Sequence, residues 1–121
     1  MEQCLVVEDD PDHRERFVAQ LACFYDPQGI EAPASLTAFE VVLEEYRQWK
    51  VLLLDGLLWL GKSWIEFDQA ILRQMAPDGV IICVSSMDIV AKLMKRKFGS
   101  VPVYYAGKRS ADLDHILRGL R

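Results

Sequence analysis

The chain has 121 residues, 51% of them hydrophobic, which is enough for one core and too short for a second domain of ordinary size. Its 14 basic and 18 acidic residues give a net charge of -4, which argues against a general nucleic-acid binder with a basic surface. No apolar stretch approaches the roughly 20 residues of a membrane span, and the apolar start is too short for a signal peptide. The sequence therefore predicts a single soluble, cytoplasmic domain over residues 1–121.

Short apolar runs rich in Val, Ile and Leu predict strands that are covered on both faces. The last run contains Pro102, which has no backbone N–H to donate and is therefore expected at a sheet edge. One further strand, at 29–34, is expected from its position in the chain rather than from its pattern. The apolar runs lie at 4–7, 51–54, 80–84 and 101–105.

Amphipathic stretches alternate with these runs and predict five helices. They are expected at 11–24, 35–46, 64–75, 87–97 and 111–120. Residues suited to their first turns or N-caps are Pro11, Ser35 or Thr37, Ser63, and Ser110 or Asp112.

The order is therefore a strand followed by a helix, repeated five times. Right-handed crossovers return each helix over the sheet, so this order predicts an α/β fold with a parallel sheet and helices on both faces.

Cysteine and histidine residues give no metal-binding pattern. Cys4, Cys23 and Cys83 lie among apolar neighbours and are expected to be buried and reduced. His13 and His115 have no partner at ligand spacing and are expected to be solvated helix residues.

Polar residues follow four of the five expected strands. The acidic run 8–10 comes directly after the first strand, Asp55 ends the third, Ser85 ends the fourth, and Lys108 follows the fifth. Ligands of open α/β sheets bind outside the carboxyl ends of the strands, so these residues are expected to share one rim. Acidic residues before a helix also cap it, so the run 8–10 alone is open to a structural interpretation.

The expected cluster has a definite chemistry. The carboxylates of Glu8, Asp9 and Asp55 repel one another, so they are expected to lie close together only with a cation between them. Oxygen ligands of this kind suit Mg²⁺, which bridges carboxylates and a phosphoryl group. A lysine and a hydroxyl beside them would stabilise charge during phosphoryl transfer to Asp55.

In these residues the sequence resembles the response-regulator receiver family over essentially its whole length. The resemblance implies a flavodoxin-like (βα)5 fold with strand order 2-1-3-4-5, a dependence on Mg²⁺, and a histidine kinase or phosphotransfer protein as phosphodonor. The matching residues are the pair Glu8 and Asp9, the acceptor Asp55, the hydroxyl residue Ser85, the lysine Lys108 and the aromatic residue Tyr105.

The resemblance also implies a role for each residue. Asp55 would accept the phosphoryl group, and Glu8, Asp9, Asp55 and the backbone carbonyl of Leu57 would bind Mg²⁺. Lys108 and Ser85 would hold phosphoryl oxygens, and Tyr105 would be the switch residue. The signal would pass to a downstream protein partner without substrate turnover, and a weak homodimer is left open.

Four positions depart from the family pattern. Arg109 stands where receivers usually have proline, Leu58 and Trp59 stand where a Met-Pro pair is common, and Glu8 stands where aspartate is commoner. Arg109, Leu58 and Trp59 favour one alternative, a receiver-like binding module that acts without phosphorylation.

Two other phosphate-handling functions compete with this interpretation. Residues 56–63 match the P-loop pattern that ends in Lys62 and Ser63, although four bulky residues occupy the part that must wrap around phosphates. An aspartate-nucleophile phosphatase would typically need a second carboxylate two residues after Asp55, where the chain has Leu57.

Overall fold

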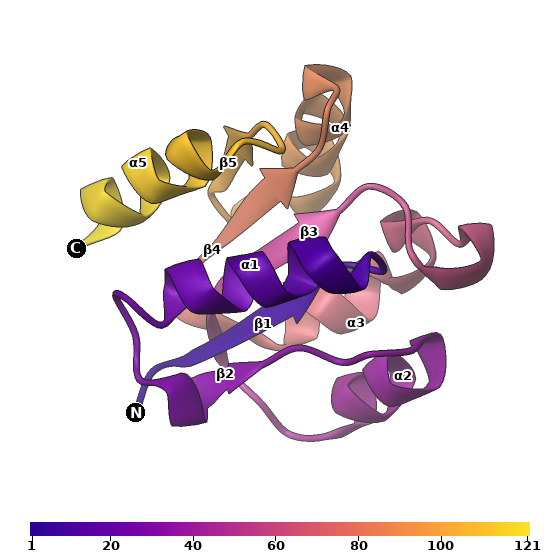
Figure 1. Ribbon diagram of the computed structural model, residues 1–121. Helices are drawn as coiled ribbons and strands as arrows, with labels where there is room; N and C mark the ends of the chain where they lie inside the picture. The colour runs from indigo at the N-terminus through magenta and orange to yellow at the C-terminus, as the bar shows by residue number, and fades with distance from the viewer.

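The computed structural model describes residues 1–121 and contains a five-stranded, fully parallel sheet (Figure 1). The strand order is β2-β1-β3-β4-β5, so the predicted α/β fold and its flavodoxin-like strand order are confirmed. The strands are β1 (Gln3–Val7), β2 (Ile30–Glu31), β3 (Trp49–Asp55), β4 (Met75–Val84) and β5 (Val103–Ala106).

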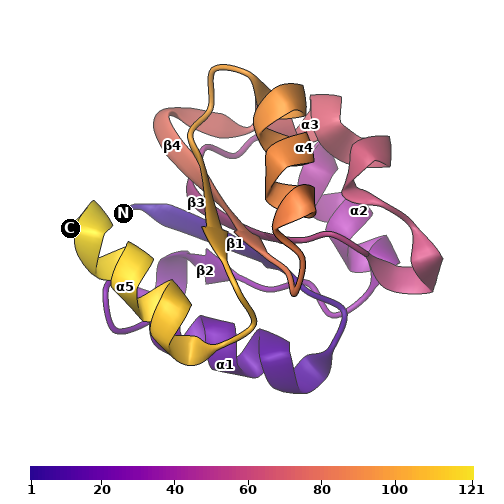
Figure 2. The same ribbon diagram turned by 90° about the horizontal axis from the view of Figure 1, so that it is seen from above.

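Five α-helices cover the sheet on both sides. Seen from above in Figure 2, α1 and α5 lie on one face and α2, α3 and α4 on the other. The helices are α1 (Pro11–Leu21), α2 (Leu36–Glu44), α3 (Asp68–Arg73), α4 (Asp88–Phe98) and α5 (Ser110–Leu120), with short 3-10 turns η1 (Pro27–Gly29), η2 (Trp59–Gly61) and η3 (Trp64–Phe67).

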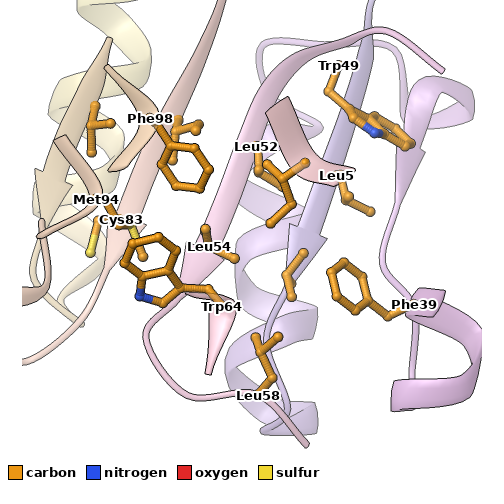
Figure 3. Packing of buried hydrophobic residues seen from close by; sticks show 14 of the residues in the cluster. Leu5, Phe39, Trp49, Leu52, Leu54, Leu58, Trp64, Cys83, Met94 and Phe98 are labelled. Atoms are coloured by element: carbon orange, nitrogen blue, oxygen red, sulfur yellow. The ribbon is translucent and has the colours of Figure 1, made fainter. Parts of the chain in front are cut away.

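The segments 4–7 of β1, 51–54 of β3 and 80–84 of β4 are apolar without interruption because each face of the sheet packs on its own core. In β3, Leu52 belongs to the cluster under α2, α3 and α4, and Leu53 to the cluster under α1 and α5. Figure 3 shows the larger cluster, in which the Trp64 and Phe98 rings lie side by side with centroids 5.2 Å apart. Burial on both faces explains why these strands show no alternation of polar and apolar residues.

The bounds predicted for the third helix, 64–75, are wrong at both ends. The segment begins as the 3-10 turn η3, and α3 is only six residues long because Phe67 at its start has φ -122° and ψ 9°. Its expected last residue, Met75, is instead the first residue of β4, which starts five residues before the predicted strand and pairs there with Trp49.

Gln74, which joins α3 to β4, is a buried residue that the sequence did not single out. Its amide nitrogen donates to three backbone carbonyls at the end of α2, at 2.7 to 3.1 Å, and its amide oxygen accepts the indole N–H of Trp49 at 2.9 Å. This side chain supplies partners for carbonyls that the end of a helix leaves unpaired.

The end of α1 corrects the prediction for one cysteine. The helix stops at Leu21, three residues earlier than predicted, and Leu21 and Tyr25 take the buried positions on either side of the turn. Cys23 therefore lies exposed between them, whereas Cys4 and Cys83 are buried as predicted. Burial raises the pKa of both buried thiols to about 12, so they remain protonated.

The predicted caps are confirmed for three of the helical segments. Pro11 is the first residue of α1, Ser35 Oγ accepts the Ala38 N–H at 3.1 Å, and Ser63 forms a capping box with Glu66. The last helix is different, because α5 begins at Ser110 itself and its N-cap, Arg109, makes no side-chain cap.

The weakest strand prediction was too long, since β2 comprises only two residues of the expected segment 29–34. The edge position of β5 is confirmed, and Pro102 precedes the strand while its carbonyl accepts the Ile81 N–H at 2.9 Å.

The two ends of the chain lie at the same side of the domain. Arg121 Nη1 donates to Glu2 Oε1 at 2.7 Å, and Figure 2 shows the termini next to each other. The helices are all too short or too polar to cross a membrane.

Candidate functional site

The carboxyl ends of β1 and β3 bring three acidic side chains together. Carboxylate oxygens of Glu8, Asp9 and Asp55 all lie within 4.8 Å of one another. The first two residues follow β1 directly, and Asp55 is the last residue of the neighbouring β3. Parallel pairing of these strands therefore accounts for the cluster expected from the sequence.

Glu8 is the innermost member of this acidic cluster and is 1% exposed. Its Oε1 accepts a hydrogen bond from the Lys108 ammonium at 2.9 Å and lies 3.2 Å from His13 Nδ1. Its Oε2 is buried and has no partner. A buried carboxylate oxygen without a donor is costly, and it is well placed to bind a cation.

Lys108, which follows β5, reaches across the sheet edge to both central carboxylates. Its Nζ lies 2.9 Å from Glu8 Oε1 and 3.5 Å from Asp55 Oδ1. Burial alone would lower the pKa of Lys108. The hydrogen bond with Glu8 and the negative charges of Asp55 and Glu8 outweigh burial, so the pKa is raised above its usual value. The lysine is therefore charged and partly balances the acidic cluster.

The crowding of carboxylates is most visible at Asp55. Burial, followed by the hydrogen bond and charge of Glu8, raises the pKa of Asp55 to about 7, and Lys108 opposes this shift only in part. Without a cation, Asp55 near neutral pH thus retains a proton that it would lose in water. A divalent ion between Asp55, Glu8 and Asp9 would replace that proton, so the donor set fits a hard cation such as Mg²⁺.

This raised pKa predicts how stability depends on pH in metal-free buffer. Between the ordinary value of 3.8 and about 7, the folded chain holds a proton on Asp55 that the unfolded chain has lost. The free energy of unfolding should therefore fall as pH rises through this window, by about 2 kcal/mol after allowance for solvent screening. Urea unfolding at pH 5 and pH 8 with a chelator measures this fall.

The matched control is Asp55→Asn, which cannot titrate and should show a smaller fall between the two pH values. A fall of the same size in this variant would assign the pH dependence to another group.

Asp10, the third residue of the acidic run, has a structural role. Its Oδ1 accepts the backbone N–H groups of Asp12 and His13 at 2.9 and 3.1 Å, which caps α1. The hydrogen bond from the His13 N–H lowers the pKa of Asp10. The structural interpretation of the acidic run therefore holds for Asp10, whereas Glu8 and Asp9 join the cluster.

Three residues of α1 hold the site, and the sequence did not single them out for it. His13 was expected to be solvated but is half-buried against Glu8. Arg14 donates to the Glu8 carbonyl at 3.1 Å, and Arg16 donates to the Lys108 carbonyl at 2.5 Å. The arginines thereby fix the backbone of two residues that are 100 positions apart in the chain.

Ser85 and Tyr105 meet beside the acidic cluster. Ser85 is buried, its Oγ accepts the Met87 N–H at 3.1 Å, and its carbonyl accepts the Tyr105 hydroxyl at 2.9 Å. Tyr105 is therefore linked to the loop that carries the candidate hydroxyl residue. Ser85 also lines a cavity together with Asp55 and Lys108.

Leu57 lies at the rim of that cavity with an exposed side chain. It pairs with Ser63 in an isolated antiparallel bridge, which closes the loop between β3 and η3. At the tip of this loop, Leu60 is exposed and has a φ of 61°, a left-handed conformation that is unfavourable for a leucine.

Residues 56–63, which match the P-loop pattern, do not form a phosphate cradle. Lys62 Nζ lies 3.7 Å from Glu66, and the Ser63 hydroxyl caps η3. The Leu58 N–H donates to the Lys62 carbonyl at 2.6 Å, and the Leu58 side chain is buried. The groups that would contact a nucleotide are engaged within the loop, so the structure gives this alternative no support.

Arg109, Leu58 and Trp59, which depart from the receiver pattern, are engaged in local contacts. The peptide bond between Lys108 and Arg109 is trans, and Arg109 Nη2 pairs with Asp112 Oδ1 at 3.3 Å. Leu58 is buried, and the Trp59 ring lies 5.9 Å from that of Phe39 between centroids. The common Met-Pro positions are thus filled by residues that anchor the loop to the core under α2.

Comparison with solved structures identifies the fold. An adenylate cyclase chain from Rhodopirellula baltica is similar with a TM-score of 0.69 and 16% identity, over 98% of this chain and 85% of that one. A CheY-like response regulator receiver domain from Methylobacillus flagellatus is similar with a TM-score of 0.66 and 18% identity, over 100% of this chain and 99% of that one. No protein-family model and no curated protein matches the sequence. The chain therefore has the fold of a receiver domain.

Proposed function

We propose that this chain, which has the receiver fold, is a phosphoacceptor of a two-component phosphorelay and takes its phosphoryl group on Asp55. One observation carries the proposal: Glu8, Asp9 and Asp55 converge within 4.8 Å at the sheet edge, with Lys108 3.5 Å from Asp55. Such a cluster combines an acceptor carboxylate, a cation site and a positive side chain. Phosphoryl transfer depends mainly on positioning and on stabilisation of charge, which these groups would provide.

Mg²⁺ is the proposed cofactor, and Glu8, Asp9 and Asp55 would hold it together with the backbone carbonyl of Leu57. The unpartnered Oε2 of Glu8 and the raised pKa of Asp55 support this assignment, because both are relieved by a cation. When bound, the ion would neutralise the negative charge that accumulates as a phosphoryl group approaches the carboxylates.

Lys108 and Ser85 are proposed to hold the phosphoryl oxygens. Lys108 already contacts Asp55 and would shift its ammonium from Glu8 toward the new charge. The Ser85 hydroxyl accepts a backbone N–H, so its own proton is free to be donated. Because Tyr105 donates to the Ser85 carbonyl, movement of this loop would reach Tyr105, the proposed switch residue.

The proposed partners are a histidine kinase or phosphotransfer protein as donor and a second protein as receiver of the signal, in the cytoplasm. The proposed role involves no turnover of a substrate. The competing proposal is a binding module that acts without phosphorylation, and it is supported by Arg109, Leu58 and Trp59.

A single experiment separates these two proposals. After incubation with Mg²⁺ and acetyl phosphate, intact mass spectrometry should show the addition of one phosphoryl group, and a chelator should prevent it. An unchanged mass over the same range of donor concentration would favour the binding module.

The metal assignment predicts different effects for two adjacent aspartates. Asp9→Asn should weaken Mg²⁺ binding on the order of tenfold or more, because it removes a charged ligand from the cluster. Asp10→Asn is the matched control, since asparagine also caps helices and Asp10 lies outside the cluster. Calorimetric titration with Mg²⁺ measures both variants, and equal losses of affinity would contradict the assignment.

A further inference from the structure

The cavity that contains the proposed acceptor extends well beyond the charged groups. It has a volume of about 510 Å³ and holds Asp9, Asp55 and Lys108 on one side. Its remaining wall is largely apolar. The apolar side chains that line it are Leu57, Trp64, Ile65, Met87, Val90 and Leu93.

Four of these apolar side chains are exposed, although they come from separate parts of the chain. The exposed fractions are 64% for Leu57, 59% for Met87, 42% for Ile65 and 40% for Leu93. Isolated exposed apolar residues are normal on a protein surface. Four of them around one concave site beside a charged cluster are typical of a binding site, which combines apolar walls with a few polar groups.

The walls of this cavity are fixed by the core. Trp64 is buried against Phe98, and the capping box between Ser63 and Glu66 sets the start of η3. On the opposite side, Val90 packs so closely over Gly56 that a Cβ there would lie 3.0 Å from its Cγ1. Four of the six apolar side chains, those of Trp64, Ile65, Val90 and Leu93, therefore belong to helical segments, and Leu57 and Met87 belong to the loops beside them.

A ligand of this cavity has to satisfy both of its parts at once. Asp55 and Lys108 select a phosphoryl group, and this step rests on the proposed function. The rest of the phosphodonor must then lie among the neighbouring apolar side chains, because they share the cavity with Asp55. A small polar leaving group would leave this apolar surface in contact with water.

We propose that, among small-molecule acyl phosphates, the site prefers donors whose leaving group is apolar and bulky, such as an aromatic or branched acyl group. In the reaction with an acyl phosphate, an Asp55 carboxylate oxygen bonds to phosphorus as the bond from phosphorus to the acyl oxygen breaks. The leaving group departs as a carboxylate with the electron pair, so no proton and no further reactant are needed.

The test compares acetyl phosphate with benzoyl phosphate on the intact chain in the presence of Mg²⁺. Intact mass spectrometry gives the concentration of each donor that half-saturates the rate of phosphorylation. This concentration should be roughly tenfold lower for benzoyl phosphate, because its ring removes apolar cavity surface from water.

Two substitutions on α4 locate the preference. Leu93→Ser should bring the half-saturating concentrations of acetyl phosphate and benzoyl phosphate closer together, because it removes part of the apolar wall. Ile89→Ser is the matched control, since Ile89 is exposed on the same helix, 47%, and lies outside the cavity. It should keep the full preference.

Binding of unreactive analogues separates this proposal from the proposed function. Phenylphosphonate should shift the methyl resonances of Ile65 and Leu93 at lower concentration than methylphosphonate does. Equal half-saturation by both donors, or equal binding of both phosphonates, would overturn the preference while leaving Asp55 phosphorylation intact. Failure of both donors to phosphorylate Asp55 would instead overturn the proposed function.

A second copy of the chain is the competing occupant of the apolar wall. If the preference disappears as protein concentration rises, and sedimentation shows a dimer that Leu93→Ser abolishes, the wall is a dimer interface and the proposal is wrong.

Discussion

Replacing Asp55 with asparagine is expected to abolish phosphorylation of the chain. A carboxamide is a poor nucleophile toward phosphorus, and Asp55 is the one member of the acidic cluster that ends the central strand β3, 3.5 Å from Lys108. The variant should remain folded, because asparagine has nearly the same shape and removes one of three crowded negative charges. Intact mass spectrometry after incubation with Mg²⁺ and acetyl phosphate measures the result.

The control for this experiment is Asp10→Asn, which should be phosphorylated like the unmodified chain because Asp10 caps α1 and lies outside the cluster. Phosphorylation of Asp55→Asn to the same extent would show that the acceptor is another residue, and peptide mapping of the product would then identify it.

Gln74→Ala is expected to cause the largest loss of stability among the single substitutions considered, about 3 kcal/mol. The side chain is 6% exposed and connects the end of α2 to Trp49 at the start of β3. Its removal leaves the indole N–H of Trp49 without its acceptor in the core and takes one donor from the carbonyls of Val42, Leu43 and Glu45. Urea unfolding followed by tryptophan fluorescence measures the change.

A matched control lies in α3, the helix that Gln74 follows. Gln69 is exposed, and Gln69→Ala should change the free energy of unfolding by less than about 0.5 kcal/mol. If Gln74→Ala were equally mild, water would be replacing the lost amide and the end of α2 would be less closed than the hydrogen bonds indicate.

The strand order and the position of the acidic cluster could be predicted because they depend on patterns along the chain. Continuous apolar runs such as 51–54 identify strands covered on both faces, and parallel strands bring the residues after them to one edge. The sequence therefore predicts that Glu8, Asp9 and Asp55 lie together, and they do. Their roles in metal binding and phosphoryl transfer remain predictions.

The boundary between α3 and β4 could not be predicted because side chains from distant segments determine it. The helical pattern continues to Met75, yet the chain turns at Gln74, whose side chain bonds carbonyls about 30 residues earlier in the sequence. Local propensity contains no information about such a contact. The same holds for Cys23, which is exposed because Leu21 and Tyr25 occupy the buried positions around it.

The supporting residues of the site were missed for a related reason. His13 and Arg16 look like ordinary polar residues of an amphipathic helix, and only the packing of α1 beside the sheet edge brings them to Glu8 and Lys108. Their spacing offers one signal that could have found them, since positions 13 and 16 are on the same face of the helix as the buried Phe17.

The ion pair between Glu2 and Arg121, at 2.7 Å, joins the first and the last segment of the domain. A chain that enters and leaves a fold at neighbouring points can be closed by a short linker and reopened elsewhere. The exposed tip around Leu60 and Gly61 is a suitable place to reopen it, because neither residue is buried and Leu60 is 90% exposed. The fold is therefore suited to circular permutation, and it could be inserted into a surface loop of a host protein without separating the host's own strands or helices.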